Sequence, residues 1–287
     1  PRERTHLFSA FFANALVAGV IGSLLGGSIP GALMRLPGLL HADLATAYRI
    51  SLSLGAALAL LAAVPLLRLR GLHEAAMRSE RLAGEGQARR QLGTIALNFL
   101  LIGTGAGLVI PFMNLYFAQR FSCSSAQIGI FFSVAQVFTA LAALFGPSLA
   151  RRFGRLRTAT ASQLLSLPFL VTLGAEKRLP IAVGSFWMRA TLMQAASPLL
   201  QAFVMDSLPQ ELRARSTSLN NLAWNIGWAV SATFAGVVIE RFGYAMPFYL
   251  TAVMYFGATV SFYLAFRHVR EGGGGDEPPV AAELVAD

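Results

Sequence analysis

The residue best suited to chemistry is Arg189, the single charge in an apolar stretch that runs from Leu179 to Met205. Its guanidinium carries five N–H donors and a permanent positive charge, so it is equipped to hold an anion. In hydrocarbon such a charge costs at least about 2.5–3.5 kcal/mol, and it is expected to face a polar partner or a watery cavity. Gln194 and Gln201 share a broad polar arc with it on a helix. The pattern predicts a polar site; a guanidinium that reaches outward, or that only ties helices together, is the alternative.

Three other apolar stretches add polar or aromatic side chains suited to the same site. Asn114 follows Pro111, a residue type that interrupts helices, and Gln136 lies in the next stretch. In a later stretch, amide and indole side chains recur at i, i+3, i+4 and i+7, on one helical face. The predicted substrate-binding set is Arg189, Gln194, Gln201, Asn114, Gln136, Asn221, Asn225 and Trp228. A single asparagine is more often a contact between helices, so the prediction rests on the convergence of the set.

Carboxylates and catalytic groups are missing from this pattern. All 14 acidic residues lie outside the apolar stretches or at their edges, and the four histidines are scattered along the chain. Cys123 is the single cysteine, and no phosphate-binding glycine loop is present. Active sites and metal sites need such groups close together. We therefore predict no catalytic residue, no metal, no cofactor and no enzymatic activity, with a membrane enzyme acting on lipid-linked substrates as a minor alternative.

The composition indicates the elements that must position these side chains. The 287 residues are 55% hydrophobic and 13% charged, whereas about a quarter of the residues in a soluble domain are charged. Eight apolar runs are long enough to cross about 30 Å of hydrocarbon. These runs are 7–33, 50–67, 92–119, 122–150, 158–175, 179–205, 216–239 and 242–266. Because backbone groups in lipid must be hydrogen-bonded internally, the runs predict helices and an all-α integral membrane protein.

The basic residues alternate between the connections of these runs. Sixteen lie in one set of connections, which includes the cluster Arg151, Arg152, Arg155 and Arg157, and six lie in the other set. Cytoplasmic loops carry the excess of basic residues, so the first set and both ends of the chain are predicted to be cytoplasmic. These loops also account for the net charge of +9. Nucleic acid is therefore not an expected partner.

The connections also divide the chain. The longest, 68–91, mixes both charges and is predicted to be a cytoplasmic loop between the segments 1–67 and 92–268. The tail 269–287 has the composition of a disordered segment. The opening block "PRERTHLFSAFFAN" is similar in pattern to "PQELRARSTSLNNLAWN" before the seventh run. This similarity predicts an internal repeat of two helix pairs, with coincidence as the alternative.

The segment "GPSLARRFGR", at the end of the fourth apolar run, resembles the cytoplasmic loop motif of the major facilitator superfamily. Gly146, Arg152, Gly154 and Arg155 match the motif, and Arg151 stands where the family prefers aspartate. Glycine permits a close helix approach or a tight turn, and arginine binds helix carbonyls or lipid phosphates. In the family this loop helps to control the conformational cycle; an ordinary basic loop is the alternative.

A second segment, "AGVIGSLLGG", resembles the glycine motif in the fifth helix of drug–proton antiporters of the same superfamily. Gly22, Gly26 and Gly27 match that motif, whereas Ser23 replaces its proline. The alternative is a small-residue face that packs against another helix.

The resemblance implies a helical bundle of which this chain holds eight of an expected twelve transmembrane helices. Segment 1–67 is expected to be the last two helices of the N-terminal half, and 92–268 the complete six-helix C-terminal half. Four further helices are expected upstream of Pro1.

The resemblance also implies a secondary active transporter that works by alternating access. An exporter or proton antiporter of small amphipathic compounds is the first expectation, and an importer of an anionic metabolite, motivated by Arg189, is the alternative. A non-transporting receptor or a lipid-modifying enzyme would be of another class. The expected partners are a small-molecule substrate, protons as coupling ion and the lipid bilayer, for a monomer in a bacterial inner membrane.

Overall fold

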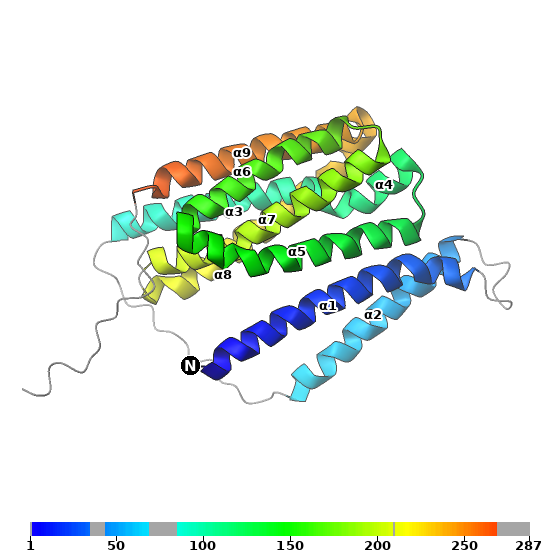
Figure 1. The fold of residues 1–287 in the computed structure, drawn as a ribbon, viewed down its shortest axis with the longest axis horizontal. Helices are drawn as coiled ribbons and strands as arrows, with labels where there is room; N and C mark the ends of the chain where they lie inside the picture. Colours follow the sequence, from blue (N-terminus) through cyan, green and yellow to red (C-terminus); the bar gives the residue numbers. More distant parts are fainter. Residues whose placement is uncertain (1, 35–43, 69–84, 209, 269–287) are drawn as a thin grey trace, which may run out of the picture.

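The computed structural model describes residues 2–34, 44–68, 85–208 and 210–268, almost all of which lie in helices (Figure 1). In chain order these are α1 (Arg2–Leu33), α2 (Leu44–Arg68), α3 (Glu85–Val109), η2 (Ile110–Phe112), α4 (Met113–Phe121), α5 (Ser125–Phe153), α6 (Arg155–Ala175), α7 (Leu179–Ser207), α8 (Gln210–Phe242) and α9 (Ala245–Phe266). No strand occurs among the described residues. The all-α prediction is therefore confirmed.

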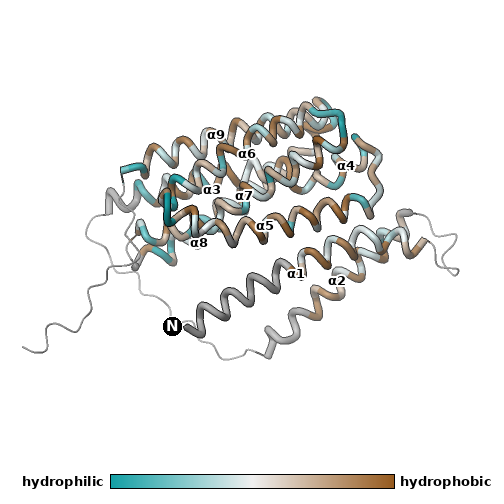
Figure 2. The backbone as a smooth tube through the Cα atoms, in the orientation of Figure 1, coloured by the Kyte–Doolittle hydropathy of each residue, from teal (hydrophilic) through white to brown (hydrophobic). Residues whose placement is uncertain are grey.

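The predicted apolar runs coincide with these helices, and their lengths fit a membrane. Within the described residues, five helices are long and apolar enough to cross a bilayer, and α1 and α2 contain shorter apolar segments, Val17–Leu33 and Ala45–Leu61. The helix at the sixth predicted run, α7 (Leu179–Ser207), which carries Arg189, is in neither group. Figure 2 shows hydrophobic backbone along the middle of the bundle and hydrophilic backbone mainly toward its two ends. This banding is expected of helices that span a hydrocarbon layer.

The third predicted run is interrupted at Pro111, as the sequence predicts. The helix α3 ends at Val109, a short 3-10 helix follows, and α4 begins at Met113. Proline has no N–H to donate, and its ring collides with the preceding helical turn. The Tyr116 hydroxyl donates to the Leu173 carbonyl over 2.6 Å, and it thereby anchors α4 to the end of α6.

The start of α5 differs from the sequence prediction, which began this run at Ser122. Ser122 has φ 54° in the left-handed region, and the helix begins at Ser125. Ser124 caps it: its hydroxyl accepts from the Gln127 N–H over 3.3 Å, and its own N–H donates to the Gln127 side chain over 2.9 Å. These two hydrogen bonds satisfy the backbone N–H groups of Ser124 and Gln127 at the start of the helix. A count of apolar residues does not detect such a cap.

The helices fall into two groups in space (Figure 1). In the larger group α3 packs against α8 and α9, α6 against α7 and α9, and α5 against α7. The helices α1 and α2 lie together, and α1 packs against α5. Most of the predicted loop 68–91 and all of the tail 269–287 lie outside the described residues, although α3 already begins at Glu85.

A close helix crossing joins α3 to α8 through glycines. A Cβ added to Gly103 would lie 2.5 Å from the Trp224 carbonyl oxygen, and one added to Gly227 would lie 2.6 Å from the Leu100 carbonyl oxygen. Gly107, one turn after Gly103, meets the backbone of Trp228 in the same way. Small residues at four-residue spacing let two helix backbones touch, as is typical of membrane helix pairs. This contact fixes α8, and with it the Trp224 indole, against α3.

Two apolar clusters fill the larger helix group. One includes Tyr116, Phe117 and Phe186, whose rings pack edge to face, and the other includes Phe203 and Phe262. Residues of both clusters reach the cavity described next. The cavity is therefore held between two well-packed regions.

Candidate substrate cavity

A cavity of about 290 Å³ lies within the larger helix group. Helices α3 to α9, together with η2, contribute to its wall. Its polar side chains are Gln136, Thr139, Gln163, Arg189, Gln194 and Ser197. Most of the remaining wall is aromatic or aliphatic, including Phe99, Phe132, Phe186, Trp224, Met113 and Met193. An apolar pocket with a few placed polar groups is typical of small-molecule sites.

Arg189 is the one charged residue in the described wall of this cavity. It lies about 15 Å along α7 from Leu179, at 1.5 Å per residue, and its exposure is 5%. The hydroxyl of Tyr255 interacts with its guanidinium. Within the described residues the Nε of Arg189 has no hydrogen-bond partner. A buried cation with a free donor is costly, and a bound acceptor or anion would offset that cost.

The amide of Gln163 shares this part of the cavity, and sequence reasoning missed it. Gln163 lies on α6, and its side-chain oxygen accepts from the Thr259 hydroxyl of α9 over 3.1 Å. Both side chains are buried. The signal was present, because Gln163 is the single amide in the apolar run 158–175. Which neighbour it meets depends on how α6 and α9 pack, which the run itself does not specify.

Three of the eight predicted binding residues line the cavity: Arg189, Gln194 and Gln136. The others lie outside it, and four of them, Asn114, Gln201, Asn221 and Asn225, are exposed. The reason on α8 is rotational, because the face that meets α3 carries Trp224 and Gly227 and leaves Asn221 to one side. Asn225 donates to the Asn221 carbonyl over 2.7 Å. Trp228 packs near Trp224, at 6.1 Å between ring centroids, without reaching the cavity wall.

The arginine-rich loop lies at the end of the bundle where α5 gives way to α6. Gly154 has φ 88° and links the two helices directly, a conformation that favours glycine. Arg151 donates to the Ser148 hydroxyl over 3.0 Å, and Arg152 stacks over the Phe153 ring at 5.3 Å. These contacts are local to the loop.

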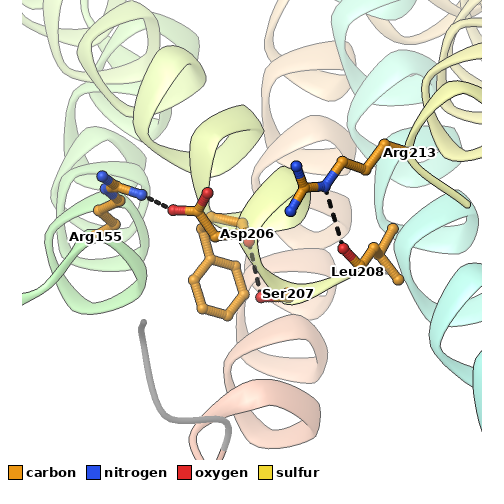
Figure 3. Close-up of polar contacts among 6 residues, drawn as sticks. Arg155, Asp206, Ser207, Leu208 and Arg213 are labelled. Atoms are coloured by element: carbon orange, nitrogen blue, oxygen red, sulfur yellow. Dashed lines mark hydrogen bonds and ion pairs between the residues drawn. The ribbon is translucent and has the colours of Figure 1, made fainter. Parts of the chain in front are cut away.

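Arg155 forms an ion pair with Asp206 near the end of α7 (Figure 3). Beside the pair, the Ser207 hydroxyl donates to the Phe203 carbonyl over 2.7 Å, and Arg213 donates to the Leu208 carbonyl over 3.2 Å. The paired side chains are 37% and 44% exposed, so the ion pair contributes at most about 1 kcal/mol. An acidic residue of another helix, Asp206 of α7, is thus an ion-pair partner of Arg155.

Two glycine expectations differ from the structure. A Cβ at Gly146 of the loop motif meets nothing within 4 Å among the described residues, so no close helix approach occurs there. The same holds for Gly22 and Gly26. On α1 the close contact is made by Gly27, whose added Cβ would lie 2.5 Å from the Ser125 carbonyl oxygen and 2.8 Å from the Gly129 Cα. The cause is helix rotation, since Gly22 and Gly26 lie on other sides of α1 from the face that meets α5.

The α1–α5 crossing extends along both helices. Ser133 donates to the Val20 carbonyl over 3.2 Å, and Gly19 packs against the side chain of Gln136, which lines the cavity. At the start of α5, Tyr48 of α2 hydrogen-bonds the Ser125 hydroxyl. Figure 1 shows α1 and α5 closest near the start of α5 and farther apart toward the start of α1.

Comparison with known proteins agrees with this architecture. Residues 95–285 match the family model for the Major Facilitator Superfamily. The uncharacterized MFS-type transporter YdeE of Escherichia coli (strain K12) is 24% identical over 58% of this chain and 42% of its own length. The niacin transporter NiaP of Acinetobacter baylyi is 26% identical, over 55% of this chain and 36% of its own. The multidrug resistance protein MdtG of Dickeya zeae is also 26% identical, over 64% of this chain and 45% of its own.

The fold also matches a solved structure, a bacterial homologue of the iron transporter ferroportin in an inward-facing state. The TM-score is 0.67 at 18% identity, over 92% of this chain and 64% of that one. The chain spans less than half the length of the three curated relatives. Two of them are transporters by name, and the described helices are those of a multi-pass membrane protein. The chain belongs to the Major Facilitator Superfamily.

Proposed function

We propose that the protein is a secondary active transporter that exports small amphipathic compounds by alternating access. The observation that carries this proposal is the cavity around Arg189, whose wall is mostly aromatic and aliphatic with a few polar groups. Such a wall holds an amphipathic molecule without demanding one hydrogen-bonding pattern. The similarity to a multidrug resistance protein supports the same class of cargo.

In this proposal α1 and α2 belong to one half of the transporter and α3 to α9 to the other. The halves rock against each other along the α1–α5 crossing, and the cavity opens to one side of the membrane at a time. The arginine-rich connections face the cytoplasm, because positive loops stay on that side. The described cavity wall holds no Asp, Glu or His, so proton coupling would use a titratable group elsewhere in the protein.

Import of an anionic metabolite is the second candidate, and the buried charge of Arg189 favours it. The two candidates differ in direction rather than in architecture. A proton-coupled importer carries its substrate inward in the same direction as the protons. An antiporter carries its substrate outward while protons move inward.

Transport in proteoliposomes tests the proposal. The full-length protein is reconstituted, and neutral, cationic and anionic derivatives of one dansyl dye are followed under proton gradients of either sign. We expect gradient-driven movement of at least one derivative, and an about tenfold loss of rate in Ser197→Trp, which fills the cavity. Val253→Trp, at a side chain that is 71% exposed on α9, is the matched control and keeps the rate. Movement no faster than in protein-free liposomes, or untouched by Ser197→Trp, contradicts the proposal.

A further inference from the structure

We propose that the Arg189 side of the cavity is an anion subsite, which binds the single negatively charged group of an otherwise apolar, flat substrate. The inference rests on the proposed transport function and names the chemical class of its cargo. A carboxylate is the group that best fits, because its two oxygens match the fork of a guanidinium. The proposed anion subsite is compatible with either direction of transport.

The first support is the balance of donors and acceptors around Arg189. The guanidinium offers only donors, and its Nε is unpartnered within the described residues. The Gln163 oxygen is already taken by the Thr259 hydroxyl, which leaves the amide N–H groups of Gln163 for the cavity. The Tyr255 oxygen accepts from the guanidinium, which leaves the hydroxyl hydrogen of Tyr255 as a further donor beside it. The unpartnered Nε of Arg189 and the free amide N–H groups of Gln163 are donors that can bind an acceptor from outside the described residues.

The second support is charge. The described wall of the cavity contains no Asp or Glu that could neutralise Arg189. The described carboxylates of Glu176, Asp206 and Glu240 lie at helix ends, and Asp206 already pairs with Arg155. Because the described wall holds one cation, a monoanion balances it, whereas a dianion would leave one charge uncompensated in an apolar surrounding.

The third support is the shape of the apolar wall. Phe132 and Phe186 pack at 5.0 Å between ring centroids, and Trp224 lines the cavity from α8. Met113 and Met193 add polarizable side chains that adapt to different outlines. Aromatic faces favour a flat ring in the ligand, while Arg189 fixes the end that carries the charge. An aromatic or unsaturated monocarboxylate combines both features.

Binding to the purified full-length protein tests this subsite without any need for transport. Benzoate, neutral benzamide and benzylammonium are titrated, with tryptophan fluorescence as the readout because Trp224 lines the cavity. We expect benzoate to bind about tenfold or more tightly than either of the other two. In Arg189→Gln the benzoate affinity falls to that of benzamide, and in Arg189→Lys, which keeps the charge without the fork, it is intermediate.

Two further variants keep the test sharp. Arg241→Gln removes the same charge at the exposed end of α8, and it leaves benzoate binding unchanged. Tyr255→Phe keeps the ring and removes only the hydroxyl, so it weakens benzoate a few-fold and leaves benzamide unaffected; it serves if Arg189→Gln does not fold. Equal binding of benzoate and benzamide overturns the proposal, as does benzoate binding that survives Arg189→Gln. Preferred binding of benzylammonium also overturns it, because it would show that a carboxylate outside the described residues already neutralises Arg189.

The outcomes separate the two proposals. Arg189-dependent benzoate binding in a protein that moves no dye would refute the transport function and keep the subsite. Gradient-driven dye transport in a protein that does not distinguish benzoate from benzamide would refute the subsite and keep the transport function.

Discussion

Gly103→Val is expected to destabilise the folded protein by about 3 kcal/mol and to lower its midpoint of unfolding. The added Cβ would lie 2.5 Å from the Trp224 carbonyl oxygen and 2.9 Å from the Trp224 Cα, so backbone atoms, not a flexible side chain, must move. The α3–α8 crossing would open, and the indole of Trp224 would leave its place in the cavity wall. Thermal unfolding in detergent, followed by tryptophan fluorescence, measures the effect.

Gly93→Val is the matched control on the same helix. Gly93 is exposed, and a Cβ there meets nothing within 4 Å among the described residues. Both variants make the same change of residue type within α3, so the difference between them isolates the crossing. Equal losses of stability in the two variants would show that the glycine contact between α3 and α8 does not hold the bundle together.

Gly27→Val is expected to lower the rate of transport about tenfold or more, while the stability of the larger helix group changes little. Its Cβ would lie 2.5 Å from the Ser125 carbonyl oxygen and would push α1 away from α5. In the proposed mechanism the two halves meet along this crossing, so the cavity could no longer close on that side. The measurement is the rate of dye transport per folded protein, with unfolding followed in parallel.

The control for Gly27→Val also separates two interpretations of the glycine motif. Gly22→Val is the control. Gly22 lies five residues before Gly27 on α1, and a Cβ there meets nothing within 4 Å among the described residues. The crossing geometry predicts that Gly22→Val transports normally. If Gly22→Val lost as much activity as Gly27→Val, the resemblance to the antiporter motif would describe this helix better than its contact with α5.

The sequence predicted the helices better than it predicted their contacts. A long apolar run is itself the property that places a helix in lipid, so the helices were predicted from the sequence. The interruption at Pro111 was predicted as well, because the proline ring breaks a helix by its own geometry. Contacts between helices depend on how each helix is rotated about its own axis. The sequence of a run that is apolar on all sides does not specify that rotation. The α3–α8 crossing at Gly103 and Gly227 was therefore missed. The pairing of Arg155 with Asp206, which are 51 residues apart in the chain, was missed for the same reason.

In the candidate site, too, features that depend on one helix alone were predicted, and features that depend on how helices pack were not. Arg189 was identified because a charge in the middle of an apolar run is unusual wherever its helix points. Asn221 and Asn225 were chosen by their spacing on α8, and the structure turns that face away from the cavity. Gln163 and Tyr255 became part of the site only when α6, α7 and α9 were placed together.

The central claim is that the cavity beside Arg189 is the substrate path and opens to each side of the membrane in turn. The most direct test is the reactivity of Ser197→Cys, at the cavity wall, toward a membrane-impermeant maleimide. The background replaces native cysteines by serine, although Cys123 is buried and burial raises the pKa of its thiol, which slows its reaction. Ser166→Cys, at a site only 1% exposed, is the unreactive control. Alternating access predicts labelling of Ser197→Cys from either side of the membrane, slowed by substrate; labelling from one side alone, or from neither, would contradict the account.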